Sequence, residues 1–136
     1  LDGSACTSIT ASSEFSAHMS ILRLTGMDAI LHGHPKFSVI MSMDCDKPNC
    51  PMKGSCHTRC PEKRFINDIP IVPGEVGTGP FGLCNTLPPA MKGSRGVIVY
   101  GHGLFTVSMI DFNEAFGNLL SIEKMCRNEY FKILEH

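Results

Sequence analysis

Short apolar runs alternate with amphipathic segments along this chain, and the alternation restricts the fold more than any other feature of the sequence. The apolar runs are as short as buried strands, whereas the amphipathic segments repeat their apolar residues at helical spacing. We predict strands or extended segments at 4–10, 28–34, 69–72, 96–100 and 104–107, and helices at 13–25, 35–43 and 112–133. This order is typical of an α/β fold, and 136 residues suffice for one domain with a single core.

The last predicted helix has the most complete pattern. Asp111 and Glu114 form a capping-box-like start, in which two side chains satisfy free backbone N–H groups of the first turn. A helix of this kind buries its apolar face. The residues predicted to line that face are Phe112, Ala115, Phe116, Leu119, Ile122, Cys126 and Tyr130.

Composition and charge exclude several classes of protein. Twelve Lys and Arg residues against thirteen Asp and Glu residues give a formal net charge of -1, so the positive field that nucleic-acid binding requires is not expected. No apolar run approaches the length that spans a bilayer. No secretory signal precedes the seven cysteines, which favours metal ligation in a reducing cytoplasm over a disulfide framework. We therefore expect a cytoplasmic protein that binds neither nucleic acid nor membranes.

Both ends of the sequence affect the predicted domain boundaries. The chain begins at Leu1 without a methionine, and we expect an N-terminal segment to be missing from it. Residues 134–136 (LEH) read as the remnant of a purification tag. The prediction is thus a single, N-terminally incomplete domain over 1–133, with a cysteine-rich insertion at 44–64.

The insertion at 44–64 is polar and interrupted by prolines and glycine, so it predicts no regular structure and needs another source of order. Four cysteines within it are candidate ligands of a second, structural metal: Cys45, Cys50, Cys56 and Cys60, with His57 as an alternate. Their spacing is not that of paired zinc knuckles, and the Cys-x3-Cys-Pro ending resembles part of a ferredoxin run. A zinc ion, an iron–sulfur cluster and a plain cysteine-rich loop all remain open. Cys6, Cys84 and Cys126 read as buried small apolar residues.

Three histidines have the spacing of a catalytic metal site. His32 and His34 lie at i and i+2 on a predicted strand and therefore project from the same face. His102 stands between two glycines at the end of a later strand. Three nitrogen ligands with one open position are typical of catalytic zinc. His-x-His alone is a weak signal, and ordinary hydrogen-bonded histidines fit it equally well.

Glu14 opens the first predicted helix, directly after Ser12 and Ser13. Serine hydroxyls and free amides at a helix start can hold an anion such as phosphate, although one of these serines could simply be an N-cap. His18 follows Glu14 by one turn on the same face and can contact its carboxylate. Besides the three histidines, this segment is therefore a candidate for substrate binding.

Taken in order, these motifs resemble the class II aldolase and adducin family. The matching motifs are Ser12-Ser13-Glu14-x-x-x-His18, His32-Gly33-His34-Pro35, Ile69-Pro70-Ile71-Val72, Tyr100-Gly101-His102-Gly103 and the long terminal helix. The resemblance runs from about Leu1 to Ile133 and is interrupted at 44–64. The ordered set is far more specific than any one motif.

The resemblance implies a three-layer α/β/α sandwich around a largely antiparallel or mixed sheet, assembled into a homotetramer with active sites at subunit boundaries. It implies a catalytic zinc ion on His32, His34 and His102, with Glu14 as acid/base, and Ser12 and Ser13 as contacts of a substrate phosphate. The implied reaction is carbon–carbon bond cleavage in a sugar-phosphate or similar hydroxy-carbonyl, through a metal-stabilised enediolate. The expected activity is therefore that of a lyase of carbohydrate metabolism.

The chain departs from the family pattern in one respect. Family aldolases use a tyrosine after the His-x-His strand as proton donor, whereas this chain has the cysteine-rich insertion there, and its only tyrosines are Tyr100 and Tyr130. Decarboxylation, dehydration and epimerisation remain open, because each passes through a similar anion. A non-catalytic, adducin-like binding domain is a further alternative, but the retained Glu14 and histidines argue against it.

Overall fold

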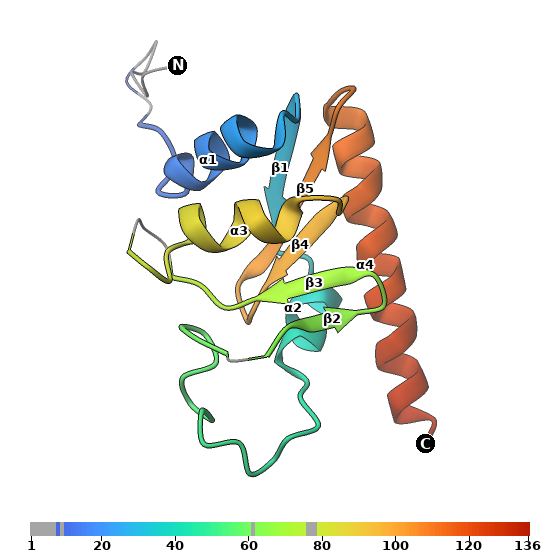
Figure 1. Cartoon of the computed structure of the whole chain (residues 1–136). Helices are drawn as coiled ribbons and strands as arrows, with labels where there is room; N and C mark the ends of the chain where they lie inside the picture. Colours follow the sequence, from blue (N-terminus) through green and yellow to red (C-terminus); the bar gives the residue numbers. More distant parts are fainter. Residues whose placement is uncertain (1–7, 9, 61, 76–78) are drawn as a thin grey trace.

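The computed structural model describes residues 8, 10–60, 62–75 and 79–136 (Figure 1). The segment predicted as extended at 4–10 lies almost wholly outside the described residues, as does Cys6. Among the described residues, no helix is both long and apolar enough to cross a bilayer.

Among the described residues, four helices alternate with the strands of a five-stranded sheet, which confirms the predicted α/β class. Every predicted helix is present, and so are the strands predicted from 28 onward. The elements are α1 (Phe15–Thr25), β1 (Ala29–Gly33), α2 (Lys36–Met43), β2 (Arg64–Ile66), β3 (Ile69–Val72), α3 (Leu83–Met91), β4 (Gly96–Val99), β5 (Gly103–Ser108) and α4 (Phe112–Leu134).

The sheet is mixed, with strand order β1-β5-β4-β3-β2. Only the β3–β4 pair is parallel; the other three pairs are antiparallel. Strand β5 pairs with both β4 and β1, and His32 of β1 lies opposite Phe105. As a result the end of β1 lies beside the β4–β5 turn, although the two are far apart in the sequence.

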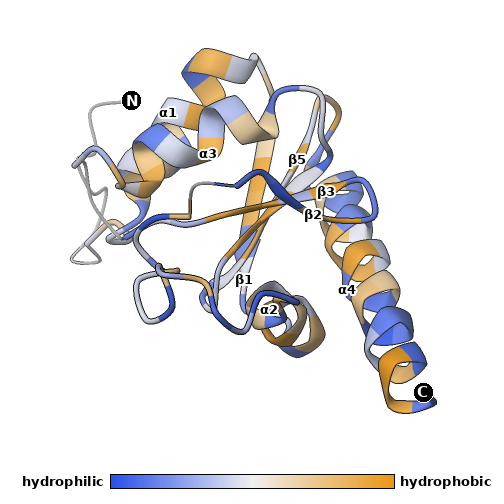
Figure 2. Cartoon of the chain, turned by 60° about the horizontal axis from the view of Figure 1, so that its bottom comes forward, coloured by the Kyte–Doolittle hydropathy of each residue, from blue (hydrophilic) through white to orange (hydrophobic). Residues whose placement is uncertain are grey.

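Helices cover both faces of the sheet, with α1 and α3 on one side and α2 and α4 on the other (Figure 2). Because strand side chains alternate between faces, successive residues of β4 and β5 supply two separate cores. Val97 and Phe105 pack toward α1 and α3, whereas Ile98 and Leu104 pack toward α2 and α4. The predicted three-layer α/β/α arrangement is thereby confirmed.

Helix α3 and strand β2 were absent from the sequence prediction. Pro88 and Pro89 lie inside α3, where each removes a backbone donor and normally interrupts a helix. The signal that could have found α3 is the helical spacing of its buried residues Leu83, Leu87 and Met91. The signal that could have found β2 is Asn67, which lies in the two-residue loop of the β2–β3 hairpin. Its positive φ of 50° suits that turn.

Helix α4 begins as predicted but exposes part of its apolar stripe. Asp111 caps it by accepting a 2.8 Å hydrogen bond from the Glu114 amide. The carboxylate of Glu114 contacts the Ser108 hydroxyl and does not return to the cap, so the box is only half formed. Phe112 and Phe116 are 64% and 52% exposed, against the prediction. Phe116 lies about 100° around the helix from buried Ala115, which places it at the edge of the packed face.

Candidate metal centre

The structure brings the three predicted histidines together at one end of the sheet. His32 lies on β1, His34 follows directly after it, and His102 lies in the turn between β4 and β5. Each offers a ring nitrogen, and these atoms all lie within 4.8 Å of one another. Among the described residues this is the only group of three or more His, Cys, Asp or Glu side chains so arranged.

The spacing of the ring nitrogens fits a single small cation. Nε2 of His32 lies 3.1 Å from Nε2 of His34, and the His34 and His102 ring centroids are 5.2 Å apart. Two nitrogen ligands of a tetrahedral zinc ion, each about 2.0–2.1 Å from the metal, are about 3.3 Å apart. The pair therefore needs little adjustment to share an ion.

His32 is held with Nε2 toward the other two rings. Its Nδ1 lies 3.2 Å from the carbonyl oxygen of Leu104, and its ring stacks on Phe105 at 4.0 Å between centroids. Burial, with a smaller contribution from the neighbouring imidazoles, lowers the pKa of His32 to about 4, although Glu14 opposes the shift. The ring is therefore neutral near pH 7. With the Nδ1 proton donated to a backbone carbonyl, as in many metal-binding histidines, Nε2 keeps a free lone pair.

The backbone around the histidines leaves room only for glycine at one position. A Cβ on Gly103 would lie 2.6 Å from the carbonyl oxygen of Gly33 and 2.7 Å from the His34 ring. Gly101, on the other side of His102, has a φ of 62°, which disfavours other residues. The glycines that flank His102 therefore let the two chain segments approach closely enough for the rings to meet.

Glu14 reaches the histidines from the start of α1. Its Oε1 lies 3.2 Å from Nε2 of His102 and 3.9 Å from Nε2 of His32. Despite this proximity, Nε2 of His102 is buried without a hydrogen bond, which is a costly state unless an ion or another partner satisfies it. The donor set, with three imidazoles and an adjacent carboxylate, fits zinc.

Ser12 and Ser13 precede Glu14 on exposed backbone, but neither caps α1. Glu14 occupies the cap position, and Ser12 instead donates from Oγ to Glu14 Oε2 at 3.1 Å. His18 packs edge-on against Phe105, with ring centroids 5.5 Å apart. Burial lowers the pKa of His18, although Glu14 opposes the shift. Glu14 is thus oriented by a serine on one side and faces the histidines on the other.

The four cysteines of the 44–64 segment do not form a comparable ligand cluster. All four are free thiols that line one cavity of about 680 Å³, with Cys45 exposed and the other three partly buried. Of the cysteines predicted to be buried, Cys126 is fully buried, whereas Cys84 is only partly buried and corrects that prediction.

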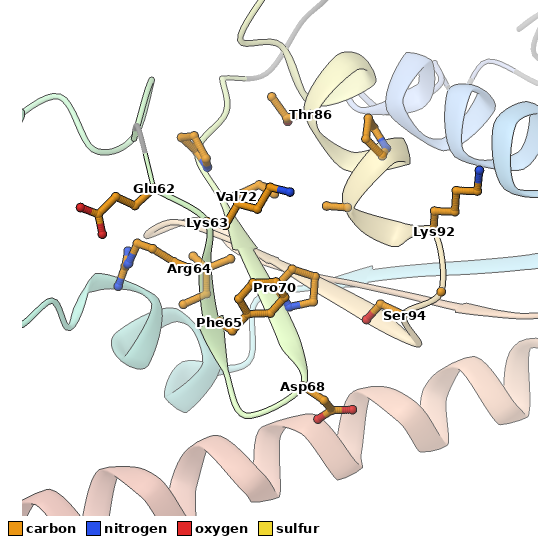
Figure 3. Close-up of a pocket in the computed structure, with 15 residues that line it drawn as sticks. Glu62, Lys63, Arg64, Phe65, Asp68, Pro70, Val72, Thr86, Lys92 and Ser94 are labelled. Carbon is orange, nitrogen blue, oxygen red and sulfur yellow. The ribbon is translucent and has the colours of Figure 1, made fainter.

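A second cavity, of about 490 Å³, lies between the β2–β3 hairpin and α3 (Figure 3). Phe65 and Pro70 stand at its centre in this view, with Thr86 and Lys92 at its α3 side. None of its lining residues belongs to the histidine group. It was not predicted, because part of its lining comes from β2 and α3, the two elements that sequence reasoning missed.

Known proteins share both the sequence pattern and the fold. The model of the class II aldolase and adducin N-terminal domain matches residues 1–130. A search of curated proteins gave no match. The crystal structure of L-fuculose-1-phosphate aldolase from Thermus thermophilus superposes with a TM-score of 0.69 at 21% identity. It covers 96% of this chain, and this chain spans 66% of its length. The chain therefore belongs to the class II aldolase and adducin family.

Proposed function

We propose that this chain is the catalytic domain of a zinc-dependent lyase that cleaves or forms a carbon–carbon bond next to a carbonyl. The substrate class is a hydroxy-carbonyl compound, sugar-like and phosphorylated. The observation that carries the proposal is the convergence of His32, His34 and His102 with the Glu14 carboxylate 3.2 Å from one ligand nitrogen. A purely binding domain has no need of a carboxylate beside such a group.

In this proposal His32, His34 and His102 hold the ion and leave one side open to substrate. When bound, zinc supplies Lewis acidity that stabilises the negative charge of an enediolate. Glu14 accepts or returns the proton at the substrate carbon, because among the described residues its carboxylate is the one that lies within 4 Å of two of the three ligand rings. Before substrate binds, the Ser12 hydroxyl donates to that carboxylate.

Phosphate recognition is assigned to Ser12 and Ser13. Both residues are exposed just before α1, where hydroxyls and the positive end of the helix dipole favour an anion. Because the two serines lie next to Glu14, they would hold a phosphate group at a fixed distance from the reacting carbon. They would therefore set the orientation of the substrate's carbon chain.

The reaction subtype has a second candidate, supported by the placement of the tyrosines. Tyr100 lies beside Cys56 and Tyr130 packs near Phe37, so neither is among the side chains grouped around Glu14. Without a nearby phenol to protonate a leaving aldehyde, epimerisation, dehydration or decarboxylation through the same enediolate-type anion is the alternative. Each of these reactions needs the ion and Glu14 but no tyrosine as an additional proton donor.

Assembly into a homotetramer, in the cytoplasm, completes the proposal. Exposed apolar side chains cluster where β5 ends and α4 begins, and they support a subunit interface. They are Met109, Ile110, Phe112, Phe116 and Leu120.

The proposal is tested by metal content and turnover measured together. We expect wild-type protein to retain zinc at the histidine group after dialysis and to act on a panel of phosphorylated hydroxy-ketones. His32→Ala should lose that zinc and the activity, while His136→Ala, the matched control at an exposed histidine, should retain both. Zinc retained at the same level in His32→Ala, measured with the fold intact, would contradict the assignment.

A further inference from the structure

The segment between α2 and β2 is a closed loop whose two ends are tied together. Arg64, at the start of β2, donates from Nη1 to the Ser42 carbonyl at 2.8 Å and from Nη2 to the Asp44 carbonyl. Lys47 pairs with Glu62 across the loop. In Figure 3 the Glu62 and Arg64 side chains point toward this loop and away from Phe65. These contacts bring the beginning and the end of the loop face to face.

Between these ties, the described part of the loop has little to order it. It contains turns but no helix or strand, for example where the Lys53 amide bonds the Cys50 carbonyl at 3.0 Å. None of its described residues belongs to either core cluster. A backbone hydrogen bond joins it to the segment after β3, where the Gly74 amide donates to the His57 carbonyl at 2.9 Å. A loop of this size with so few buried contacts needs a further stabilising interaction.

All four cysteines of the loop line the same cavity, together with Tyr100 from the β4–β5 turn. They are free thiols rather than disulfides. Four thiols around one cavity supply the complete ligand set of a tetrahedral sulfur site. The four sulfur atoms do not yet form a ligand cluster, so a metal would have to draw this loop, which lacks regular structure, around a common centre.

A hydrogen-bond donor and several cationic side chains lie around the thiols. The Met52 amide donates to Cys50 Sγ at 3.4 Å, the i to i+2 hydrogen bond that stabilises negative charge on sulfur. Lys47, Lys53 and Arg64 line the same cavity and oppose the charge of several thiolates. Asp44, Asp46 and Glu62 also line it, so the cationic side chains are partly balanced.

We propose that Cys45, Cys50, Cys56 and Cys60 together bind one thiophilic metal centre, separate from the histidine group. Zinc and an iron–sulfur cluster share the required tetrathiolate ligation, and metal and sulfide analysis distinguishes them. Binding releases the thiol protons to solvent and leaves the cysteine sulfurs as thiolate ligands; an iron–sulfur cluster would contain inorganic sulfide as well.

The centre would also support the turn that carries His102. Tyr100 lies beside Cys56, and the Arg64 guanidinium carbon lies over the Tyr100 ring, 5.8 Å from the ring centroid. One residue further on, the Gly101 amide donates to Ser42 Oγ at 2.8 Å. Residues on both sides of the loop therefore contact the segment immediately before His102, so an ordered loop fixes that segment.

The experiment measures zinc, iron and acid-labile sulfide per chain in anaerobically purified His32→Ala protein, in which the histidine group is disabled. We expect about one zinc ion, or iron with matching sulfide and visible absorption, to remain bound. Cys50→Ser and Cys56→Ser in this background should lose it, whereas the matched control Cys84→Ser should retain it. This design separates failure of the loop centre from failure of the histidine site.

A second measurement covers variants that fail to fold. Cobalt(II) added to metal-stripped wild-type protein should give intense thiolate-to-cobalt charge-transfer absorption, which imidazole ligands alone do not produce. Absence of that absorption, or thiol titration showing Cys45, Cys50, Cys56 and Cys60 paired as disulfides in the native protein, would overturn the proposal. Metal content unchanged by Cys50→Ser would overturn it as well.

Discussion

Glu14 Oε1 lies 3.2 Å from Nε2 of His102, which joins the start of α1 to the β4–β5 turn. The two residues are far apart in the sequence, and the fold places a carboxylate directly beside the predicted metal ligands. This contact makes Glu14 the residue whose replacement is most informative about the chemistry.

Glu14→Gln should keep the fold and most of the zinc while lowering turnover by about 10²–10⁴-fold, the range typical of a lost general acid or base. Glutamine preserves shape and hydrogen bonding but cannot accept the proton. Thermal melting, zinc content and kcat are measured on the same preparation. Turnover close to wild type on the true substrate would show that another group, such as His18, moves the proton.

Gly103→Ala should destabilise the protein by roughly 1–3 kcal/mol, as overpacking does, and reduce metal retention. The reason is the Cβ that would lie 2.6 Å from the Gly33 carbonyl oxygen and 2.9 Å from Cε1 of His32. Gly117→Ala is the matched control, because a Cβ there meets no atom within 4 Å and α4 should gain about 0.5–1 kcal/mol. Urea unfolding of both variants decides the prediction; equal stability of the two would refute it.

Glu123 should be a strong stabiliser of α2. Its carboxylate accepts from the amides of Phe37 and Ser38, each at 2.9 Å, and from Ser38 Oγ at 2.8 Å. Those amides are free donors of the first turn of α2. Glu123→Ala should cost roughly 1–3 kcal/mol, since charge-assisted bonds are lost and a buried hydroxyl is left without its partner. Exposed Glu135→Ala should change the unfolding free energy little in the same denaturation experiment.

The cysteines should differ sharply in their reaction with iodoacetamide. Burial raises the pKa of Cys126, so near pH 8 its thiol holds less of the reactive thiolate than a free cysteine and is shielded as well. Exposed Cys45 should react first in metal-free native protein. Mass spectrometry of the alkylated peptides gives the order, and early labelling of Cys126 would argue against its burial on the inner face of α4.

Sequence periodicity was enough to predict most of the architecture. In helix α4 and strand β1 the apolar residues recur with a clear period, because each element buries apolar side chains in a core. Helix α3 was missed because Pro88 and Pro89 lower the local helix propensity. Packing against α1 and the sheet overrides that low propensity and holds the helix in place. The exposure of Phe116 was missed because a periodic pattern defines an apolar face but not its width.

The candidate site was predicted in composition but not in geometry. His-x-His on a strand fixes that His32 and His34 share a face, whereas the approach of His102 depends on the pairing of β1 with β5. The position of Glu14 over the rings depends on how α1 packs across the sheet. Such long-range contacts have no local signal, and only the family resemblance pointed to them.

The pairing of β1 with β5 has a consequence for folding order. His32 and the Leu104 carbonyl that orients it are 72 positions apart, so the ligand group cannot exist in any partly folded state that lacks this pairing. Closing so large a span is entropically costly and slow compared with forming the β4–β5 hairpin. An ion on the three rings would bind late in folding and would link the first and last thirds of the sequence. Its concentration would then determine how long the native state persists before it opens, as well as whether the enzyme is active.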